Sequence, residues 1–396
     1  MQRCLVEYKV PFVNYPLQYQ MIKAEIDTKI QNLLSRGELY LREETQKFEQ
    51  DFAKFVGCKY GISVNSCTDA MFLSIYGIFE SCGRRGTHRL GKIVTVSHTY
   101  VSTISSILNN DFGVILADVD ANDYNIDVET LEDTINRKES ISPTIGILPV
   151  HLNGRCCNMD IIMKIAKEHN LVVIEDSAQA VGAMYDGKKA GSFGDTGCFS
   201  FYPAKILGSY GDAGIITTNN KELAMRLYDL RDNGEKPKYM MTQNELKYRY
   251  IQEFGFMSVM DNIQAGVLNI KMKYLPKWIK ERREIADWYL EMLIDDPFID
   301  LPYAPDDKEY FDVYQNYVIR VKNRDKVQKQ LEEKGIETMV SWRIPNHKQP
   351  KLMRLHQFNL PVTERISKEV LSLPMYPELL FDQVKYVCDI LKQVVR

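Results

Sequence analysis

The alternation of short apolar runs with helical segments is the feature that most constrains how this chain can fold. Six runs have the composition of β-strands: KIVTV (92–96), GVILADV (113–119), TIGILPV (144–150), LVVIED (171–176), GCFSF (197–201) and AGIITT (213–218). Residues 158–170, which separate two of these runs, have the apolar spacing of an amphipathic helix. Apolar strands joined by helical crossovers are typical of a largely parallel sheet covered on both faces. The sequence therefore predicts an α/β fold in which ligands bind at the carboxyl ends of the strands.

The pattern changes at about Asp261, where long helical segments replace the apolar runs. This later part also holds a strand, YQNYVIRV (314–321), and a terminal helix. A chain of 396 residues has room for two domains. We expect a large domain over residues 1–255, with a mostly parallel sheet flanked by helices, and a smaller α+β domain over residues 256–396. Within the first domain, residues 21–55 are expected to be helical.

The charge balance and the cysteine content exclude several classes of protein. Lys and Arg total 50 and Asp and Glu total 53, so the formal net charge is −3. This balance gives no support for nucleic acid or an anionic membrane as a partner. No stretch approaches the roughly 18 apolar residues of a membrane helix, and the first residues lack the apolar core of a signal peptide. The eight cysteines are scattered without a CxxC pair, which favours reduced thiols over disulfides or a zinc site. We expect a cytoplasmic protein without a metal.

The stretch FSFYPAKILGSYGDAG (199–214) places Lys205 between Ser200 and three glycines. Lysines are seldom buried, so Lys205 taken alone is interpreted as a surface residue. The strand LVVIED ends at Asp176, which taken alone is equally typical of a helix N-cap. Because both residues follow successive strands of one sheet, they are able to face one cavity. A lysine that forms a Schiff base and a carboxylate that holds a protonated ring nitrogen are the marks of a pyridoxal 5'-phosphate (PLP) site.

Two further features fit this cofactor. In VNSCTDAMFLSI (64–75), a small polar turn with Thr68 and Asp69 leads into a helix whose N-terminal amides would favour a phosphate. A purely structural helix cap explains the same residues equally well. VSHTYVSTI places Tyr100 just after a strand, where its ring either stacks on the cofactor or packs in the core. Each signal is weak alone, and their order along one sheet favours a PLP site.

Several longer motifs occur in register along the chain: FEQDFAKFVGCKYGISVNSCTDA, TVSHTYVSTI, VDANDYNID, PVHLNG, VVIEDSAQAVGA, CFSFYPAKILGSYGDAG and LSLPMYPEL. Together they resemble the DegT/DnrJ/EryC1/StrS family of sugar aminotransferases, from about Pro11 to the C-terminus. The resemblance implies the large aspartate-aminotransferase fold, PLP as the cofactor, and a homodimer with active sites at the subunit interface.

The resemblance also implies roles for individual residues. Lys205 matches the catalytic lysine that binds PLP covalently, and Asp176 matches the aspartate that binds the pyridine nitrogen. The other matches are Gln179 near the phenolic oxygen, Tyr100 stacked on the ring, Thr68 and Asp69 as backbone contacts of the phosphate, Ser200 as a hydroxyl contact, and Asn233, which the neighbouring subunit donates to the phosphate.

The implied reaction transfers an amino group, usually from glutamate, to a keto sugar carried by a nucleoside diphosphate. KILGSYGDAG lacks the TTGEGG ending common among members that aminate carbon 4, and it is closer to the type associated with carbon 3. We therefore expect a 3-keto sugar. The resemblance further implies a role in polysaccharide biosynthesis, such as that of lipopolysaccharide O-antigen.

Three segments depart from the family pattern. Met257 and Val259 stand where the family commonly has Asn and Arg, which weakens the expected hold on an anionic substrate. Asn153 replaces the usual aromatic residue in PVHLNG, and residues 40–45 replace a common ILGPEV, so the sugar pocket is expected to differ. Four basic residues precede Met257 in the sequence, and they either replace the arginine that is missing from that segment or form a solvated loop: Lys236, Lys238, Lys247 and Arg249.

Three alternative functions stay open at this level. A PLP-dependent sugar-nucleotide dehydratase of the same family carries His at the lysine position, so Lys205 argues against it. A non-catalytic, ligand-binding regulator of the same fold is consistent with the changes at Met257 and Val259. An amino-acid aminotransferase would need arginines that hold a carboxylate, and Arg343 is a candidate for one of them.

Overall fold

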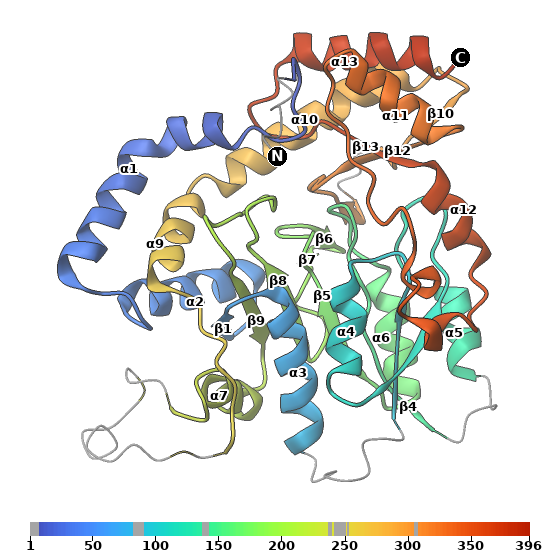
Figure 1. Ribbon diagram of the computed structural model, residues 1–396. Coiled ribbons are helices and arrows are strands. Elements are labelled where there is room, and N and C mark those ends of the chain that lie inside the picture. Colours follow the sequence, from blue (N-terminus) through green and yellow to red (C-terminus); the bar gives the residue numbers. More distant parts are fainter. Residues whose placement is uncertain are drawn as a thin grey trace.

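The computed structural model describes residues 8–81, 91–136, 142–236, 240, 251, 253–304 and 308–396. A seven-stranded sheet lies at the centre with helices around it, and a smaller three-stranded sheet with its own helices lies near the C-terminus (Figure 1). The predicted α/β architecture, with a smaller α+β part, is confirmed. The central sheet positions the candidate site, because the segments that carry the predicted residues begin at its strand ends.

The strand order in the central sheet is β1-β9-β8-β5-β4-β2-β3. Its strands are β1 (Tyr60–Val64), β2 (Lys92–Val96), β3 (Gly113–Ala117), β4 (Thr144–Ile147), β5 (Val172–Asp176), β8 (Thr196–Ser200) and β9 (Gly214–Thr218). The pairs β2–β3, β2–β4, β4–β5 and β5–β8 are parallel, whereas β9 runs antiparallel to β1 and β8. Every residue of β8 and β9 is buried, as their continuous apolar runs predict. All six predicted strands are present, and β1 is an additional strand that was not predicted.

Helices cover this sheet and connect its strands: α3 (Cys67–Ser81), α4 (Val101–Leu108), α5 (Val128–Asn136), α6 (Met159–Glu168) and α7 (Lys221–Leu230). α3 packs against β5, β8 and β9 and also contacts α4 and α7. α6 confirms the helix predicted over residues 158–170. Asn158 caps the start of α6 by accepting the N–H of Ile161. The apolar face of α6 is buried against the sheet.

The helical region predicted over residues 21–55 consists of two helices, α1 (Tyr15–Arg36) and α2 (Glu43–Val56). Gly37 ends α1 with a left-handed φ of 67°, and its N–H donates to carbonyls of the last helical turn. A small apolar cluster packs α1 along α9 (Asn262–Lys271), which also contacts α2. The break at Gly37 therefore turns the chain back toward the central sheet.

The smaller sheet has the order β10-β12-β13. Its elements are β10 (Ile299–Asp300), β12 (Tyr317–Val321) and β13 (Val370–Leu373), with α10 (Leu275–Leu293), α11 (Arg324–Glu333), α12 (Pro361–Glu369) and α13 (Phe381–Val394). Val10 pairs with Ile336, so the N-terminal segment joins this part. Conversely, Trp342 and Leu360 pack against the core of the central sheet. Contacts thus cross the expected boundary after residue 255 in both directions, and that boundary stays a prediction.

The remaining elements are short: β6 (Met184–Tyr185), β7 (Lys188–Lys189) and β11 (Tyr310–Phe311) form a third sheet, and η3 (Asn346–Lys348) and η4 (Met353–Leu355) are single turns. Across the described ranges, no helix is long and apolar enough to span a membrane. The same ranges hold no cluster of three or more His, Cys, Asp or Glu side chains that could bind a metal ion.

Candidate active site

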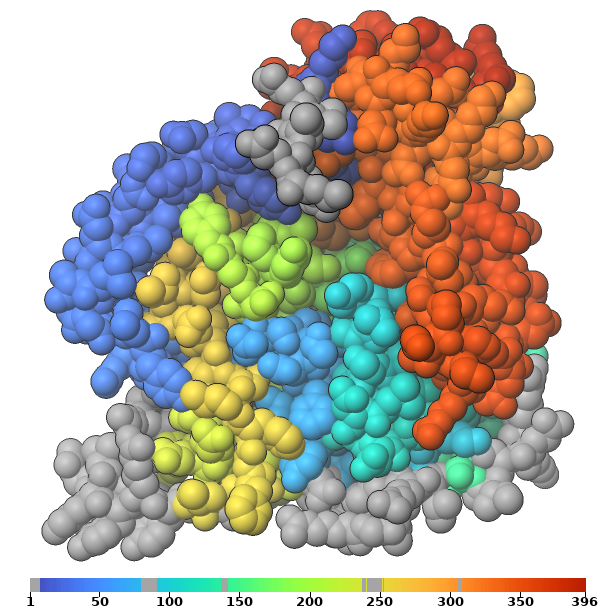
Figure 2. Space-filling model, viewed as in Figure 1, coloured from blue at the N-terminus to red at the C-terminus, as the bar shows by residue number. Residues whose placement is uncertain are grey.

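Lys205 lies in the loop that connects β8 to β9 through residues 201–213. The loop is tight: Lys205 donates its backbone N–H to the Tyr202 carbonyl (2.9 Å), and a Cβ on Gly208 would lie 2.3 Å from the Pro203 carbonyl oxygen. Glycine alone allows this close approach, because it lacks a Cβ. Figure 2 shows the yellow-green atoms of this loop at the surface between the blue α1 and the turquoise α4. This loop is therefore exposed at the edge of the sheet, and Lys205 within it is partly accessible.

The environment of the Lys205 amine differs from that of a surface lysine. The residue is half-buried, and Nζ forms no hydrogen bond or ion pair with the part of the chain that the structure describes. Burial lowers the pKa of Lys205 below the ordinary value of lysine, whereas the negative charge of Asp176 acts to raise it. The amine is therefore more easily deprotonated than that of an exposed lysine, as a nucleophile or a base requires.

Asp176 ends β5, the strand next to β8, and pairs in register with Cys198. The residue is 4% exposed; its Oδ2 accepts from Thr103 Oγ1 (2.8 Å), and its Oδ1 accepts the Ala178 N–H (3.2 Å). Burial raises the pKa of Asp176, whereas the two hydrogen bonds and the charge of Lys205 act to lower it. A short turn rather than a helix follows Asp176, so it is not a helix N-cap. The Asp176 carboxylate and the Lys205 amine each shift the pKa of the other, as two groups in one site do.

α4 presents two side chains at the same edge of the sheet. Tyr100 occupies the N-cap position, and 64% of its surface is exposed, so its ring is open to a ligand. Thr103 lies in the first turn of α4 and is buried, where its hydroxyl contacts Asp176 and, at 2.8 Å, Thr99 Oγ1. Thr103 was not predicted. Its position near the start of a helix after a strand is the one signal in the sequence, and many threonines share it.

Ser66, in the turn before α3, is the N-cap of this helix. Ser66 Oγ accepts the Asp69 N–H (3.1 Å), and the Asp69 carboxylate accepts from Ser258 Oγ (2.7 Å). A Cβ on Gly214 would lie 2.4 Å from the Ser66 carbonyl carbon, so β9 packs directly against this turn. Of the two amides expected to bind a phosphate, that of Asp69 is therefore already paired. Thr68 lies in the first helical turn, where amides have no partner within the helix.

Gln179 and Ser200 occupy polar positions at the same edge. Gln179 follows β5, and its Oε1 accepts the Asn153 N–H (2.9 Å). Asn153 has a left-handed φ of 56°, which asparagine tolerates better than most residues, and its Oδ1 accepts from Asn316 Nδ2 (3.1 Å). Ser200 ends β8 and is buried, with its Oγ accepting the Tyr202 N–H (3.3 Å). The carbonyl oxygen of Gln179 is thus occupied, which leaves its Nε2 to donate to a ligand oxygen.

Asn233 lies on a different segment, the loop that follows α7. It is exposed, has a left-handed φ of 57°, and donates to Met257 Sδ (3.5 Å). Arg231 anchors the loop: its guanidinium is fully buried, pairs with Glu49 and donates to the Ser63 carbonyl (2.6 Å). The loop is therefore fixed at its base, and Asn233 faces outward from it.

Two of the departures from the family pattern, at Met257 and in residues 40–45, lie beside this loop. Met257 is exposed, and its Sδ also accepts from the Tyr40 hydroxyl (3.8 Å). Of the basic residues considered as replacements for an arginine, Lys236 is described. The other three lie outside the described residues, so their role stays a prediction: Lys238, Lys247 and Arg249.

Arg343, the candidate for binding a carboxylate, and the buried His151 both have structural partners. Arg343 donates to Gln328 Oε1 (2.9 Å) on α11, so its guanidinium is engaged within the smaller part of the chain. His151 is fully buried between the Glu175 carboxylate (3.0 Å from Nε2) and the Cys157 N–H (3.0 Å from Nδ1). The structure therefore leaves His151 no free ring nitrogen for a ligand, and it turns the Arg343 guanidinium toward α11.

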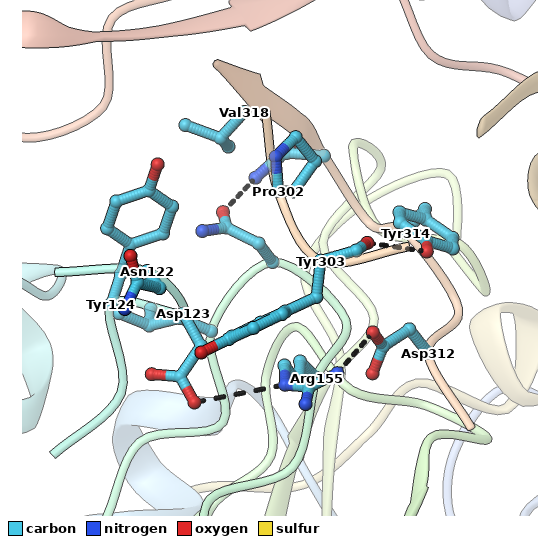
Figure 3. Close-up of a pocket in the computed structure, with 12 residues that line it drawn as sticks. Asn122, Asp123, Tyr124, Arg155, Pro302, Tyr303, Asp312, Tyr314 and Val318 are labelled. Atoms are coloured by element: carbon cyan, nitrogen blue, oxygen red, sulfur yellow. Dashed lines mark hydrogen bonds and ion pairs between the residues drawn. The ribbon is translucent and has the colours of Figure 1, made fainter. Parts of the chain in front are cut away.

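A small cavity lies beside Asn153 (Figure 3). Its volume is about 30 Å³, room for about one water molecule. Arg155 lies along it and pairs with Asp312 (2.7 Å) and Asp123 (3.8 Å), and the Tyr303 ring covers the guanidinium at 4.6 Å. The cavity is too small for a sugar and its charges are paired, so it supports the surrounding loops rather than a substrate.

Comparison with known proteins agrees with the resemblance seen in the sequence. The model of the DegT/DnrJ/EryC1/StrS aminotransferase family matches residues 20–392. The dTDP-3-amino-3,6-dideoxy-alpha-D-galactopyranose transaminase of Aneurinibacillus thermoaerophilus is 39% identical over 380 residues, 96% of this chain and 98% of that protein. The pleiotropic regulatory protein of Geobacillus stearothermophilus is 35% identical over 390 residues, 98% of this chain and 99% of that protein. The crystal structure of S. venezuelae DesV in complex with a ketimine intermediate is 31% identical, covers 97% of this chain and 98% of its own, and superimposes with a TM-score of 0.87. The chain therefore belongs to the DegT/DnrJ/EryC1/StrS aminotransferase family.

Proposed function

We propose that this protein is a PLP-dependent transaminase that moves an amino group from glutamate to a nucleotide-linked 3-keto sugar. The observation that carries the proposal is the placement of Asp176 at the end of β5 and of Lys205 in the loop after the adjacent parallel strand β8. One supplies an unpaired amine of lowered pKa, and the other supplies a buried carboxylate. These are the groups that hold the aldehyde and the protonated ring nitrogen of PLP.

The other predicted residues fit the remaining parts of the cofactor. The exposed ring of Tyr100 suits the pyridine face, and the free Nε2 of Gln179 suits the phenolic oxygen. The Ser200 hydroxyl and the start of α3, with Thr68, suit the phosphate. When bound, PLP supplies the electron sink that allows an amino group to pass between an amino acid and a keto group.

In this proposal Lys205 acts both as a nucleophile and as a base. Its amine would condense with the aldehyde of PLP with loss of water, and the incoming substrate amine would exchange with it and release the lysine. Its neutral amine then moves a proton between two carbon atoms, and its lowered pKa increases the neutral fraction near pH 7. Asp176, held by Thr103, keeps the ring nitrogen protonated.

The 3-keto sugar is favoured by two observations. The Aneurinibacillus relative is named for a dTDP-linked 3-amino sugar, and KILGSYGDAG is closer to the type associated with carbon 3. The name of the Geobacillus relative is the reason to keep a regulatory function as the alternative. The amine–carboxylate arrangement favours catalysis over that alternative. We further propose a cytoplasmic location and a role in polysaccharide biosynthesis, such as that of O-antigen.

The reaction is tested most simply in reverse. Purified protein with PLP is given a dTDP-linked 3-amino-3,6-dideoxyhexose and 2-oxoglutarate, and glutamate is measured by chromatography. We expect glutamate from the wild type and none from Lys205→Ala, with far less from the corresponding 4-amino sugar. Equal yields from both sugars would show that the assignment to carbon 3 is wrong. A protein that neither binds PLP nor forms glutamate would favour the regulatory alternative.

We also propose a homodimer in which Asn233 reaches the PLP phosphate of the partner subunit. Asn233 is exposed on a loop with a firmly anchored base, which suits a contact with another molecule. The test mixes Lys205→Ala subunits with Asn233→Ala subunits. A mixed dimer has one site with both natural residues, so two impaired variants should together regain about a quarter of the wild-type activity. If Asn233 serves its own subunit, mixing restores nothing.

A further inference from the structure

Gln315 binds both peptide groups that flank Lys205. Its Nε2 donates to the Ala204 carbonyl (2.9 Å), and its Oε1 accepts the Ile206 N–H (2.9 Å). Gln315 is 8% exposed and lies more than a hundred residues farther along the chain, just before β12. One side chain from the smaller part of the chain therefore closes on the loop of the central sheet that carries Lys205.

These two bonds have a geometric consequence for Lys205. The direction of its Cα–Cβ bond is set by the two planar peptide groups on either side of its Cα. Gln315 holds one group in each plane, the C=O before Lys205 and the N–H after it. In this irregular loop neither group has a partner from a helix or a sheet, and the Gln315 side chain supplies a partner for both. Holding both planes fixes the direction in which the lysine side chain leaves the main chain.

The main chain at Gln315 is itself hydrogen-bonded by a buried arginine. Arg282 of α10 is 4% exposed, and its Nη1 donates to the carbonyls of Tyr314 (3.0 Å) and Gln315 (3.3 Å). Tyr314 has a left-handed φ of 48°, which turns the chain sharply before β12. The main chain that carries the Gln315 side chain is thus fixed by α10, independently of the loop that it binds.

The next residue extends the contact to a second predicted site residue. Asn316 Nδ2 donates to Asn153 Oδ1 (3.1 Å), and the Asn153 N–H donates to Gln179 Oε1 (2.9 Å). Gln315 and Asn316 therefore connect one segment of the smaller part to Lys205 and to Gln179. The segment before β12 is placed to align both groups together.

The chemistry of the contact favours glutamine at this position. A neutral primary amide has a donor and an acceptor that can satisfy a C=O and an N–H at once. Glutamate at position 315 would still accept the Ile206 N–H, but it could not donate to Ala204 and would place a negative charge near the lysine. Methionine would fill a similar volume without either hydrogen bond.

We propose that Gln315 is a positioning residue for Lys205, which fixes both adjacent peptide groups and thereby directs the amine toward the edge of the sheet shared with Asp176. It acts through Lys205 and does not itself contact the reacting atoms. The inference rests on the proposed function, because it takes Lys205 as the reacting amine. Its test therefore begins with a measurement that requires no catalysis.

The first experiment measures the reactivity of Lys205 in the cofactor-free protein. Acetylation by acetic anhydride is followed against pH by peptide mass spectrometry in the wild type, Gln315→Glu and Gln357→Glu. Gln357 is exposed and provides the same change of charge elsewhere. We expect the midpoint for Lys205 to move to higher pH by about half to one unit in Gln315→Glu, because a nearby negative charge stabilises the ammonium form. Gln357→Glu should leave it unchanged. An unchanged midpoint in folded Gln315→Glu would overturn the inference.

The second experiment uses the enzyme with PLP bound. Gln315→Met should lower kcat by about tenfold to hundredfold while KM for glutamate changes by less than about threefold, because a misdirected amine slows the chemistry more than it weakens binding. A folded Gln315→Met variant with kcat within about twofold of the wild type would overturn the proposal. If this variant does not fold, the acetylation of Gln315→Glu decides the question. If the wild type neither binds PLP nor transfers amino groups, the proposed function fails, whereas the acetylation midpoint still supports or refutes the contact with Lys205.

Discussion

Thr103 and Asp176 lie 73 residues apart in the sequence and are joined by a 2.8 Å hydrogen bond from Oγ1 to Oδ2. Both side chains are buried, one in the first turn of α4 and the other at the end of β5. Burial raises the pKa of Asp176, and the Thr103 hydroxyl opposes that rise. The helix therefore supports a charge that the interior of the sheet alone would disfavour, and an ionised Asp176 is what a protonated ring nitrogen requires.

Replacing Thr103 with valine tests this relationship with little change of shape. Hydrogen bonds to charged groups contribute about 1.5–3 kcal/mol, so Thr103→Val should weaken PLP binding by about tenfold or more. Spectroscopic titration of the cofactor-free protein with PLP measures the affinity. Thr103→Ser keeps the hydroxyl and should stay within about threefold of the wild type. A loss in Thr103→Ser as large as that in Thr103→Val would show that the hydroxyl does not account for the effect.

The strands of the central sheet were largely predictable because buried parallel strands are continuous apolar runs. β1 (YGISV) was missed for a physical reason: its partner β9 follows only after some 150 residues of other structure. Its identity as a strand depends on that distant pairing. The break at Gly37 was also missed, because two amphipathic helices in succession have the same local pattern as one long helix.

The candidate site likewise contains residues that could be predicted from the sequence and residues that could not. Lys205 and Asp176 were predictable, because each follows an apolar run and each has a side chain with a definite chemical use. Thr103, Ser258 and Gln315 were not predicted, since each is an ordinary polar residue that reaches the site only through the packing of a distant segment. The residues expected to meet the cofactor are thus visible in the sequence, whereas those that orient them are visible only in the structure.

Lys205 and Asp176 are coupled through their charges, so a change at one shifts the pKa of the other. Burial holds the pKa of Lys205 below its ordinary value, and the charge of Asp176 raises it. Asp176→Asn removes the raising effect, so the pKa falls further and the neutral amine appears at lower pH. In the cofactor-free protein, the midpoint of Lys205 acetylation should therefore move to lower pH, opposite in direction to the shift in Gln315→Glu. A folded variant with an unchanged or higher midpoint would contradict the coupling.

Ser258 connects a distant segment to the turn that precedes α3. Its hydroxyl donates to Asp69 Oδ2 (2.7 Å) and accepts the Asn65 N–H (3.3 Å), and Ser258→Ala removes both bonds. With about 1 kcal/mol for each bond, PLP affinity should fall by about fivefold to thirtyfold. Pyridoxal, which lacks the phosphate, provides the control, and its affinity should be nearly unchanged. A parallel loss for both compounds would show that this turn does not bind the phosphate.

Gly208 allows the loop around Lys205 to close, because a Cβ there would lie 2.3 Å from the Pro203 carbonyl oxygen. Gly208→Ala must push the main chain apart, so it should destabilise the protein by about 1–3 kcal/mol and lower kcat through the displaced lysine. Gly211→Ala is the matched control in the same loop: its Cβ would meet the flexible amide of Gln264 at 2.8 Å, which can move aside. Thermal unfolding and kcat measured for both variants separate the two cases. Equal effects would show that the loop tolerates no added side chain anywhere, whereas a loss confined to Gly208→Ala would assign the constraint to the close approach that holds Lys205 in place.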